Sequence, residues 1–114
     1  MHELSIAEDL IQLVEDTARR ESARRVKTVV IEIGRLSTVE PDALAFAFDE
    51  VKRGGLAAEA SLQLIDIPGA GCCRECGQTS PMDEIYAVCA HCGSRYVDPV
   101  AGQEMRVREI EIES

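Results

Sequence analysis

Four of the five cysteines fall into two pairs, and each pair has two residues between its members. Cys73 and Cys76 form the first pair, and Cys89 and Cys92 form the second. This spacing lets each pair form a tight turn that aims both sulfurs at one tetrahedral centre. A set of four soft thiolates favours Zn²⁺ over Mg²⁺ or Ca²⁺. Because protein ligands fill all four positions, no position remains for a catalytic water, and we expect a structural zinc ion.

Neighbouring residues support this site and also offer alternatives to it. Gly77 and Gly93 each follow the second cysteine of a pair, where such a turn often requires positive φ. Disulfides or an iron–sulfur centre are other uses of four cysteines. Cys72 can replace Cys73 if three residues separate the first two ligands, and His91 can replace a thiolate in a set of three cysteines and one histidine. Cys73 matches the spacing of the second pair, so we expect it to be the ligand.

The amino terminus offers a second, different metal site. The amine of Met1 and the amide nitrogen of His2 close a five-membered chelate ring, and that amide and Nδ1 of His2 close a six-membered ring. Planar nitrogen donors suit Ni²⁺ or Cu²⁺. Affinity should rise with pH, because the amide must lose its proton. The fourth donor can be the Glu3 amide or a side chain such as Glu40. Taken alone, this is a weak signal: a lone histidine at position 2 is usually an ordinary exposed residue, and Glu40 can simply serve the start of a helix.

Composition and charge narrow the classes of function. The chain has 114 residues and a formal net charge of −9, which repels phosphate backbones. A zinc-ribbon adaptor that binds protein or nucleic acid in transcription is the alternative class. However, the cysteine segment carries Arg74 and Arg95 as its only basic residues besides His91 and lacks a stacking platform. We find no Ser/His/Asp set, phosphate-binding glycine loop or open metal site, so we expect no enzyme.

The expected compartment is the cytoplasm. No run of 18 apolar residues is present, which predicts no membrane span, and the first residues lack the basic segment of a signal peptide. Thiols stay reduced in such a compartment, which favours metal binding over disulfides.

Hydrophobic periodicity predicts two helices and three strands outside the cysteine segment. A capping-box pattern from Ser5 to Glu8 predicts a first helix over residues 6–22. Pro41 suits the start of a second helix, which Gly54 and Gly55 stop. The expected strands cover residues 26–33, 62–67 and 104–113. The alternation of the last strand changes phase near residues 108–109, which predicts a bulge or a strand covered on both faces.

These elements predict an α+β fold: a small mixed three-stranded sheet with two helices, plus an inserted zinc-ribbon-like domain with four cysteine ligands. Residues 1–70 and 103–114 would form a nickel-binding domain, and residues 71–102 a zinc-binding domain. The last strand needs a sheet to join, and we expect the cysteine segment to offer none. That segment has few large aliphatic residues, so metal binding is expected to supply its folding free energy.

Several segments resemble the HypA/HybF family of hydrogenase nickel-incorporation proteins. They are the opening Met1-His2-Glu3-Leu4-Ser5, residues 29–34 and 44–49, the two cysteine pairs, and residues 104–107. The resemblance covers essentially the whole chain in one order. Members of this family are cytoplasmic metallochaperones that help deliver Ni²⁺ to [NiFe]-hydrogenase together with a nickel-handling GTPase. Some members also serve urease.

The resemblance implies roles for particular residues. His2 would be the essential nickel ligand, with Met1 and Glu3 contributing main-chain nitrogens, and Glu3 would also contact the GTPase. Glu40 stands where some relatives carry an aspartate proposed as a nickel-site carboxylate. The expected partners are therefore the GTPase and the hydrogenase large subunit, with Zn²⁺ as structural metal and Ni²⁺ as the transported ion.

Overall fold

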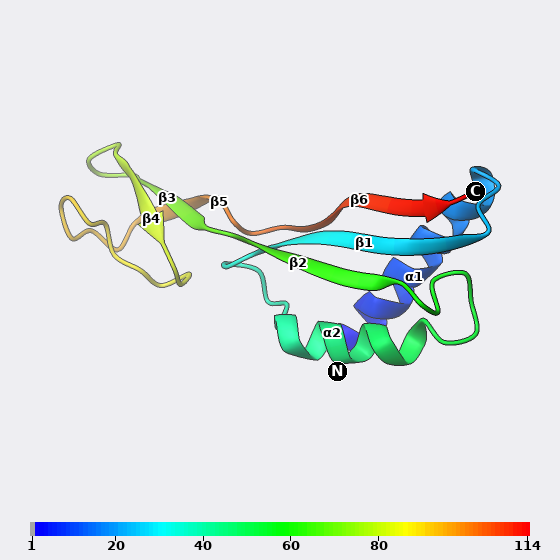
Figure 1. Ribbon diagram of the computed structural model, residues 1–114. Helices are drawn as coiled ribbons and strands as arrows, with labels where there is room; N and C mark the ends of the chain where they lie inside the picture. Colours follow the sequence, from blue (N-terminus) through cyan, green and yellow to red (C-terminus); the bar gives the residue numbers. More distant parts are fainter. Residues whose placement is uncertain (1) are drawn as a thin grey trace. The chain divides into compact units, whose positions relative to one another are not determined.

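The computed structural model describes residues 2–114 (Figure 1). It contains two helices and two three-stranded sheets, with strand orders β2-β1-β6 and β4-β3-β5. This confirms the expected α+β class. The elements in chain order are α1 (His2–Arg20), β1 (Arg25–Gly34), α2 (Pro41–Val51), β2 (Ser61–Ile67), β3 (Gly69–Cys73), β4 (Thr79–Met82), β5 (Val97–Ala101) and β6 (Met105–Glu113).

The chain forms two compact units. The helical unit comprises residues up to 31, 39–64 and 107–114, and the cysteine unit comprises residues 32–38 and 65–106. The expected division at residues 71 and 102 into a nickel-binding and a zinc-binding domain remains a prediction, because it assigns a function to each part.

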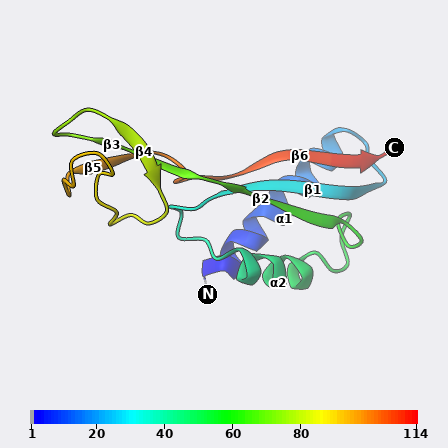
Figure 2. The ribbon, with the colours of Figure 1, turned by 60° about the vertical axis from the view of Figure 1, so that its left-hand side comes forward.

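The first sheet is mixed, and its hydrogen bonds give the strand directions. The amides of Arg24 and Gly34, at opposite ends of β1, donate to the carbonyls of Glu113 and Glu104, so β6 is antiparallel to β1. The Val26 amide donates to the carbonyl of Leu56, which precedes β2, and the Arg35 amide donates to the carbonyl of Ile67 at the end of β2. Because both residue numbers rise together, β2 is parallel to β1. A parallel pair needs a crossover connection, and α2 supplies it (Figure 2).

The core of the helical unit is aliphatic, with one aromatic ring. Phe48 on α2 and Ile31 on β1 are completely buried, together with Leu44 and Val14. The buried positions of α1 recur at helical spacing, which turns one face of that helix toward this core; they are Ala7, Leu10, Ile11, Val14 and Ala18. Burial of these side chains supplies the main stabilising free energy of the unit.

The first helix begins four residues earlier than the sequence pattern predicts. Ser5 lies inside α1 and does not cap it, because the helix starts at His2. Glu3 places a negative charge in the first turn, and its carboxylate accepts a hydrogen bond from the Glu40 amide at 3.2 Å. This contact stabilises the first turn of α1, residues 2–5. A capping pattern depends on neighbouring residues only, so it could not predict a contact with a residue distant in sequence.

The end of α1 also differs slightly from the expected residue 22. Ser22 has φ of 56°, and the amide of Ala23 donates to the carbonyl of Ala18 at 2.9 Å. This arrangement is a Schellman motif, which satisfies the last carbonyls of the helix and turns the chain toward β1.

The second helix begins as expected. Glu40 is its N-cap, and the Glu40 carboxylate accepts a hydrogen bond from the Ala43 amide at 2.8 Å. Pro41 occupies the first turn, where no amide donor is needed. The helix ends at Val51, before the two glycines that were expected to stop it.

The cysteine unit has a sheet of its own, which corrects the expectation that this segment offers none. β3 pairs antiparallel with β4 and with β5. A Cβ atom at Gly71 would lie 2.5 Å from both Met82 Sδ and Val97 Cγ1, so only glycine fits beneath these side chains. The sheet was missed because β3 consists of small residues and β4 contains a proline, with Thr79 as the one β-branched residue in the two strands.

The last strand shows the expected change of phase. Arg108 and Glu109 are consecutive exposed residues in β6, whereas exposed and half-buried positions alternate before them. After these two residues, the half-buried apolar side chains of β6 fall at even-numbered positions and no longer at odd-numbered ones, as the sequence pattern indicates.

Candidate metal centres

Two turns of the same geometry carry the cysteine pairs. In the first, the Gly77 amide donates to the Cys73 carbonyl at 2.9 Å, and Gly77 has φ of 75°. In the second, the Gly93 amide donates to the Cys89 carbonyl at 2.9 Å, and Gly93 has φ of 76°. Glycine adopts this left-handed conformation without steric cost, which explains both expected glycines.

Backbone hydrogen bonds close each turn, and an ion pair ties the first turn to a strand. The Cys73 amide donates to the Gln78 carbonyl, and the Cys89 amide donates to the Ser94 carbonyl at 2.8 Å. In addition, Arg74 forms two hydrogen bonds with the Asp98 carboxylate at 2.8 and 2.9 Å. The contact between Arg74 and Asp98 joins the turn after β3 to β5 and helps to hold the first pair in place.

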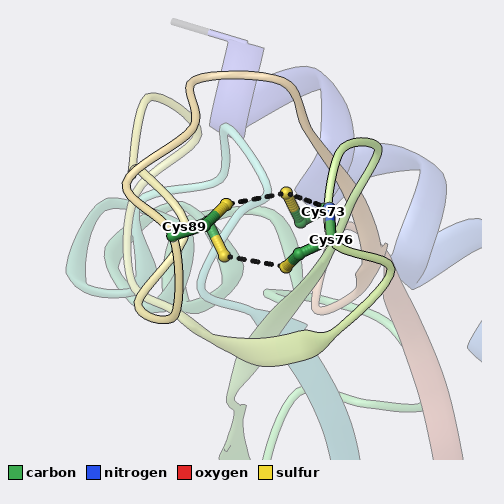
Figure 3. A group of neighbouring side chains, drawn as sticks. Cys73, Cys76 and Cys89 are labelled. Carbon is green, nitrogen blue, oxygen red and sulfur yellow. Dashed lines mark hydrogen bonds between the residues drawn. The ribbon is translucent and has the colours of Figure 1, made fainter.

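The four sulfurs lie together. Cys73 and Cys92 have their Sγ atoms 3.6 Å apart, and so do Cys76 and Cys89. All four Sγ atoms lie within 4.8 Å of one another, and Figure 3 shows the labelled side chains facing a common centre. Sulfurs placed tetrahedrally at about 2.3 Å from zinc are about 3.8 Å apart, so the donor set fits a zinc ion.

Hydrogen bonds and crowding shift the pKa values of these thiols in opposite directions. The Cys76 amide donates to Cys73 Sγ and lowers the pKa of Cys73 to about 6. The amides of Cys92 and His91 lower the pKa of Cys89. The Ser94 amide lowers the pKa of Cys92, but neighbouring sulfurs and burial outweigh it and raise that pKa to about 12. Four adjacent thiolates therefore require a cation, which agrees with a structural Zn²⁺.

The two alternative ligands lie outside the sulfur cluster. Among residues 2–114, Cys73, Cys76, Cys89 and Cys92 form the one group of three or more His, Cys, Asp or Glu side chains whose ligand atoms lie close enough together to hold a metal ion. Cys72 points its Sγ toward the carbonyl of Gly77 at 3.8 Å. The backbone amide of His91, and not its ring, contacts the cluster through Cys89 Sγ at 3.3 Å. No disulfide joins any of the five cysteines in this structure.

The structure also brings together three of the residues expected to bind nickel. His2 Nδ1 lies 3.3 Å from Oε2 of Glu3, and the same oxygen accepts the Glu40 amide. Contact with that amide is the main reason why the pKa of Glu3 is lowered. The His2 side chain is 53% exposed, and the Glu3 side chain is 12% exposed. Met1, the fourth expected residue, lies outside the described part of the chain.

The side chain of Glu3 has a structural role that the sequence analysis missed. The sequence indicated only its amide nitrogen and a contact with the GTPase, whereas its carboxylate links the first turn of α1 to the start of α2. An acid in the first turn of a helix is a weak signal for such a contact. The Glu40 side chain, in turn, caps α2 through the Ala43 amide, which bears out the plainer of its two expected roles.

Together these features define a class of protein. It is an α+β metal-binding protein in which a four-thiolate cluster is built on a small sheet inserted into the chain, and in which a histidine occupies the first turn of the first helix. Within residues 2–114, no helix is both long and apolar enough to cross a membrane.

Comparison with known proteins identifies the family. Residues 1–112 match the family model described as hydrogenase/urease nickel incorporation, metallochaperone, hypA. The hydrogenase maturation factor HypA of Dechloromonas aromatica is 60% identical over 113 residues, which are 99% of this chain and all of that protein. The HypA of Albidiferax ferrireducens is 45% identical over the same shares.

Solved structures agree. The solution structure of the Ni metallochaperone HypA from Helicobacter pylori has a TM-score of 0.70 at 28% identity and covers 98% of this chain and 97% of its own. Another solution structure of a HypA protein has a TM-score of 0.72 at 30% identity, with 98% and 96% covered.

The chain belongs to the HypA family of nickel-incorporation metallochaperones. The family resemblance and the function of a nickel metallochaperone in hydrogenase maturation, both expected from the sequence, are confirmed. The alternative of a zinc-ribbon adaptor in transcription is not favoured.

Proposed function

We propose that this metallochaperone holds its nickel cargo at the amino terminus. His2 would supply its amide nitrogen and Nδ1, Met1 its amine, and Glu3 its amide nitrogen, with the Glu40 carboxylate as an additional donor. The observation that carries the proposal is the meeting of His2, Glu3 and Glu40 at one place on the helical unit. Glu3 and Glu40 are distant in sequence, yet Oε2 of Glu3 accepts a hydrogen bond from the Glu40 amide and also lies 3.3 Å from Nδ1 of His2.

The position of His2 suits a cargo site. Its side chain is more than half exposed, so a bound ion is accessible to another protein. The amides of the first turn of a helix have no carbonyl four residues earlier, so their use as ligands disrupts no helical hydrogen bond. A nickel ion held by few donors at the exposed start of a helix would exchange readily. A carrier protein needs such exchange to release its metal ion.

The cysteine unit would hold the resident metal. Cys73, Cys76, Cys89 and Cys92 would bind Zn²⁺ as thiolates, and zinc binding would supply folding free energy to a unit whose core is small. All four ligands come from the protein, which leaves no position for a reacting water, so we infer no catalytic activity.

The proposed partners are proteins that would give nickel to this metallochaperone or receive nickel from it. A nickel-handling GTPase and the hydrogenase large subunit would exchange the ion with this protein by direct contact, in the cytoplasm, and urease is a second candidate target. The net charge of −9 does not suit nucleic acid as a partner. Four cysteines that bind a metal as thiolates would suit a reducing compartment.

The test is nickel binding by the untagged protein, measured by calorimetry with zinc already bound. His2→Ala should abolish tight nickel binding, and His91→Ala, which removes the other histidine of the chain, should leave it unchanged. A peptide tag on the amino terminus should also abolish binding, because it converts the amine of Met1 into an amide. The proposal fails if His2→Ala binds nickel as tightly as the parent protein.

A further inference from the structure

A groove of about 500 Å³ lies on the helical unit. The first turn of α1 and one face of α2 line it. The lining residues are Glu3, Leu4, Ala43, Phe46, Ala47 and Glu50.

The lining residues of α2 form a regular stripe. Positions 43, 46, 47 and 50 follow the i, i+3, i+4, i+7 spacing of one helix face. Ala43 and Ala47 have small side chains, which permit a close approach to the α2 backbone. Phe46 is 71% exposed and Leu4 is 41% exposed, although both are large and apolar. Large apolar side chains that gather at an open groove mark an interaction site.

The charged residues of the groove are both acidic. Glu3 and Glu50 contribute carboxylates, and no lysine or arginine is among the lining residues. Arg53 lies 3.4 Å from Glu50, but the two side chains are 73% and 50% exposed, so this pair is weak and easily exchanged. The groove therefore complements an apolar side chain flanked by positive charge.

We propose that this groove binds an amphipathic helix of a partner protein, with an apolar stripe that contacts Phe46 and Leu4 and with Lys or Arg residues that pair with the exposed Glu50, while the Glu3 carboxylate, held by the Glu40 amide, adds negative charge beside them. Binding of a helix in an apolar groove between two helices is a recurrent mode of recognition. The inference deepens the proposed function, on which it rests, because Glu3 also contacts His2 and the docked helix would lie beside the nickel cargo.

The probe is a fluorescein-labelled peptide of about 18 residues, five turns of helix, with leucine on one face and lysine on its flanks. Its anisotropy is titrated with the zinc-loaded protein. The parent should bind this peptide and should not bind a version with glutamate in place of lysine. Phe46→Ala should weaken binding by roughly tenfold or more, as expected for a central aromatic contact. Leu13→Ala, which truncates another exposed apolar side chain of the same unit, is the matched control and should bind like the parent.

A second pair of variants tests the charges. Glu50→Lys should weaken binding, whereas Asp9→Lys makes the same change in net charge on the exposed part of α1 and should not. Equal binding by the Phe46→Ala variant and the parent, or equal effects of the two lysine substitutions, would overturn the proposal. So would a parent dimer that Phe46→Ala converts to a monomer in sedimentation, because the groove would then hold a second copy of this chain.

The two proposals fail separately. Phe46→Ala should keep the nickel affinity of the parent, and His2→Ala should keep the peptide affinity. Loss of peptide binding in His2→Ala would contradict a groove that is built from Phe46 and its neighbours alone. Nickel binding that survives in His2→Ala would contradict the proposed cargo site and leave the groove result standing.

Discussion

The carboxylate of Glu3 accepts a hydrogen bond from the backbone amide of Glu40 at 3.2 Å, so the first turn of α1 is tied to the N-cap of α2. The same oxygen lies 3.3 Å from Nδ1 of His2. One carboxylate thus connects the histidine expected to bind nickel with Glu40, which lies 37 positions after Glu3 in the chain. This side chain lies at both the proposed cargo site and the groove.

Glu3→Gln should lower the melting temperature at neutral pH. The Glu40 amide lowers the pKa of Glu3 below its ordinary value of 4.5, so the ionised carboxylate stabilises the fold above that pH. The stabilisation is lost as the pH falls through the lowered pKa, and the melting temperatures of variant and parent should converge there. Thermal unfolding followed by circular dichroism from pH 7 to pH 3 measures this. Glu8→Gln, on the exposed part of α1, should show no such pH-dependent difference.

Cys73→Ser should reduce the zinc content from about one ion per chain to a small fraction of that, because it removes one of four thiolates. Cys72→Ser changes the adjacent residue and should keep zinc at the parent level, since its sulfur lies outside the cluster. Zinc is measured by mass spectrometry after dialysis against a chelator. Loss of zinc in both variants would contradict the assigned ligand set.

Phe48→Ala and Phe46→Ala make the same chemical change, one at a buried side chain of α2 and the other at an exposed side chain of the same helix. Phe48 is fully buried in the helical unit, so its truncation should lower the free energy of unfolding by about 3–5 kcal/mol. Phe46 is 71% exposed, and its truncation should change that free energy by less than about 0.5 kcal/mol. Urea unfolding of the zinc-loaded proteins compares them, and similar losses for both would contradict the assigned core.

Gly93→Ala should weaken zinc binding. No atom lies within 4 Å of a Cβ at this position, so the cost arises from the positive φ of 76° and not from a clash. A left-handed alanine costs about 1–2 kcal/mol, which corresponds to a roughly five- to thirtyfold lower affinity. Gly93→Asn should lose less, because asparagine adopts this conformation more readily. Competition with a chromophoric chelator measures both affinities, and an unchanged affinity in Gly93→Ala would show that the turn relaxes.

Local signals predicted the parts of the fold that depend on local physics. The start of α2 at Pro41 and the extended character of residues 26–33 follow from side-chain chemistry and pattern. The start of α1 was predicted wrongly, because the carboxylate of Glu3 meets an amide from another helix. The sheet of the cysteine unit was missed for a similar reason, since Gly71 is selected by the packing of Met82 and Val97 and not by strand propensity.

The four zinc ligands could be proposed from the sequence alone, because the spacing within each pair and the following glycine determine the turn that orients both sulfurs. The tertiary structure decided that the two turns meet, with cross-pair sulfur distances of 3.6 Å, and that Cys72 stays outside. It also decided that His2, Glu3 and Glu40 come together, and that Leu4 and Phe46 share a groove. These relationships join residues of separate elements, and their distances depend on how α1 packs against α2, which no local pattern encodes.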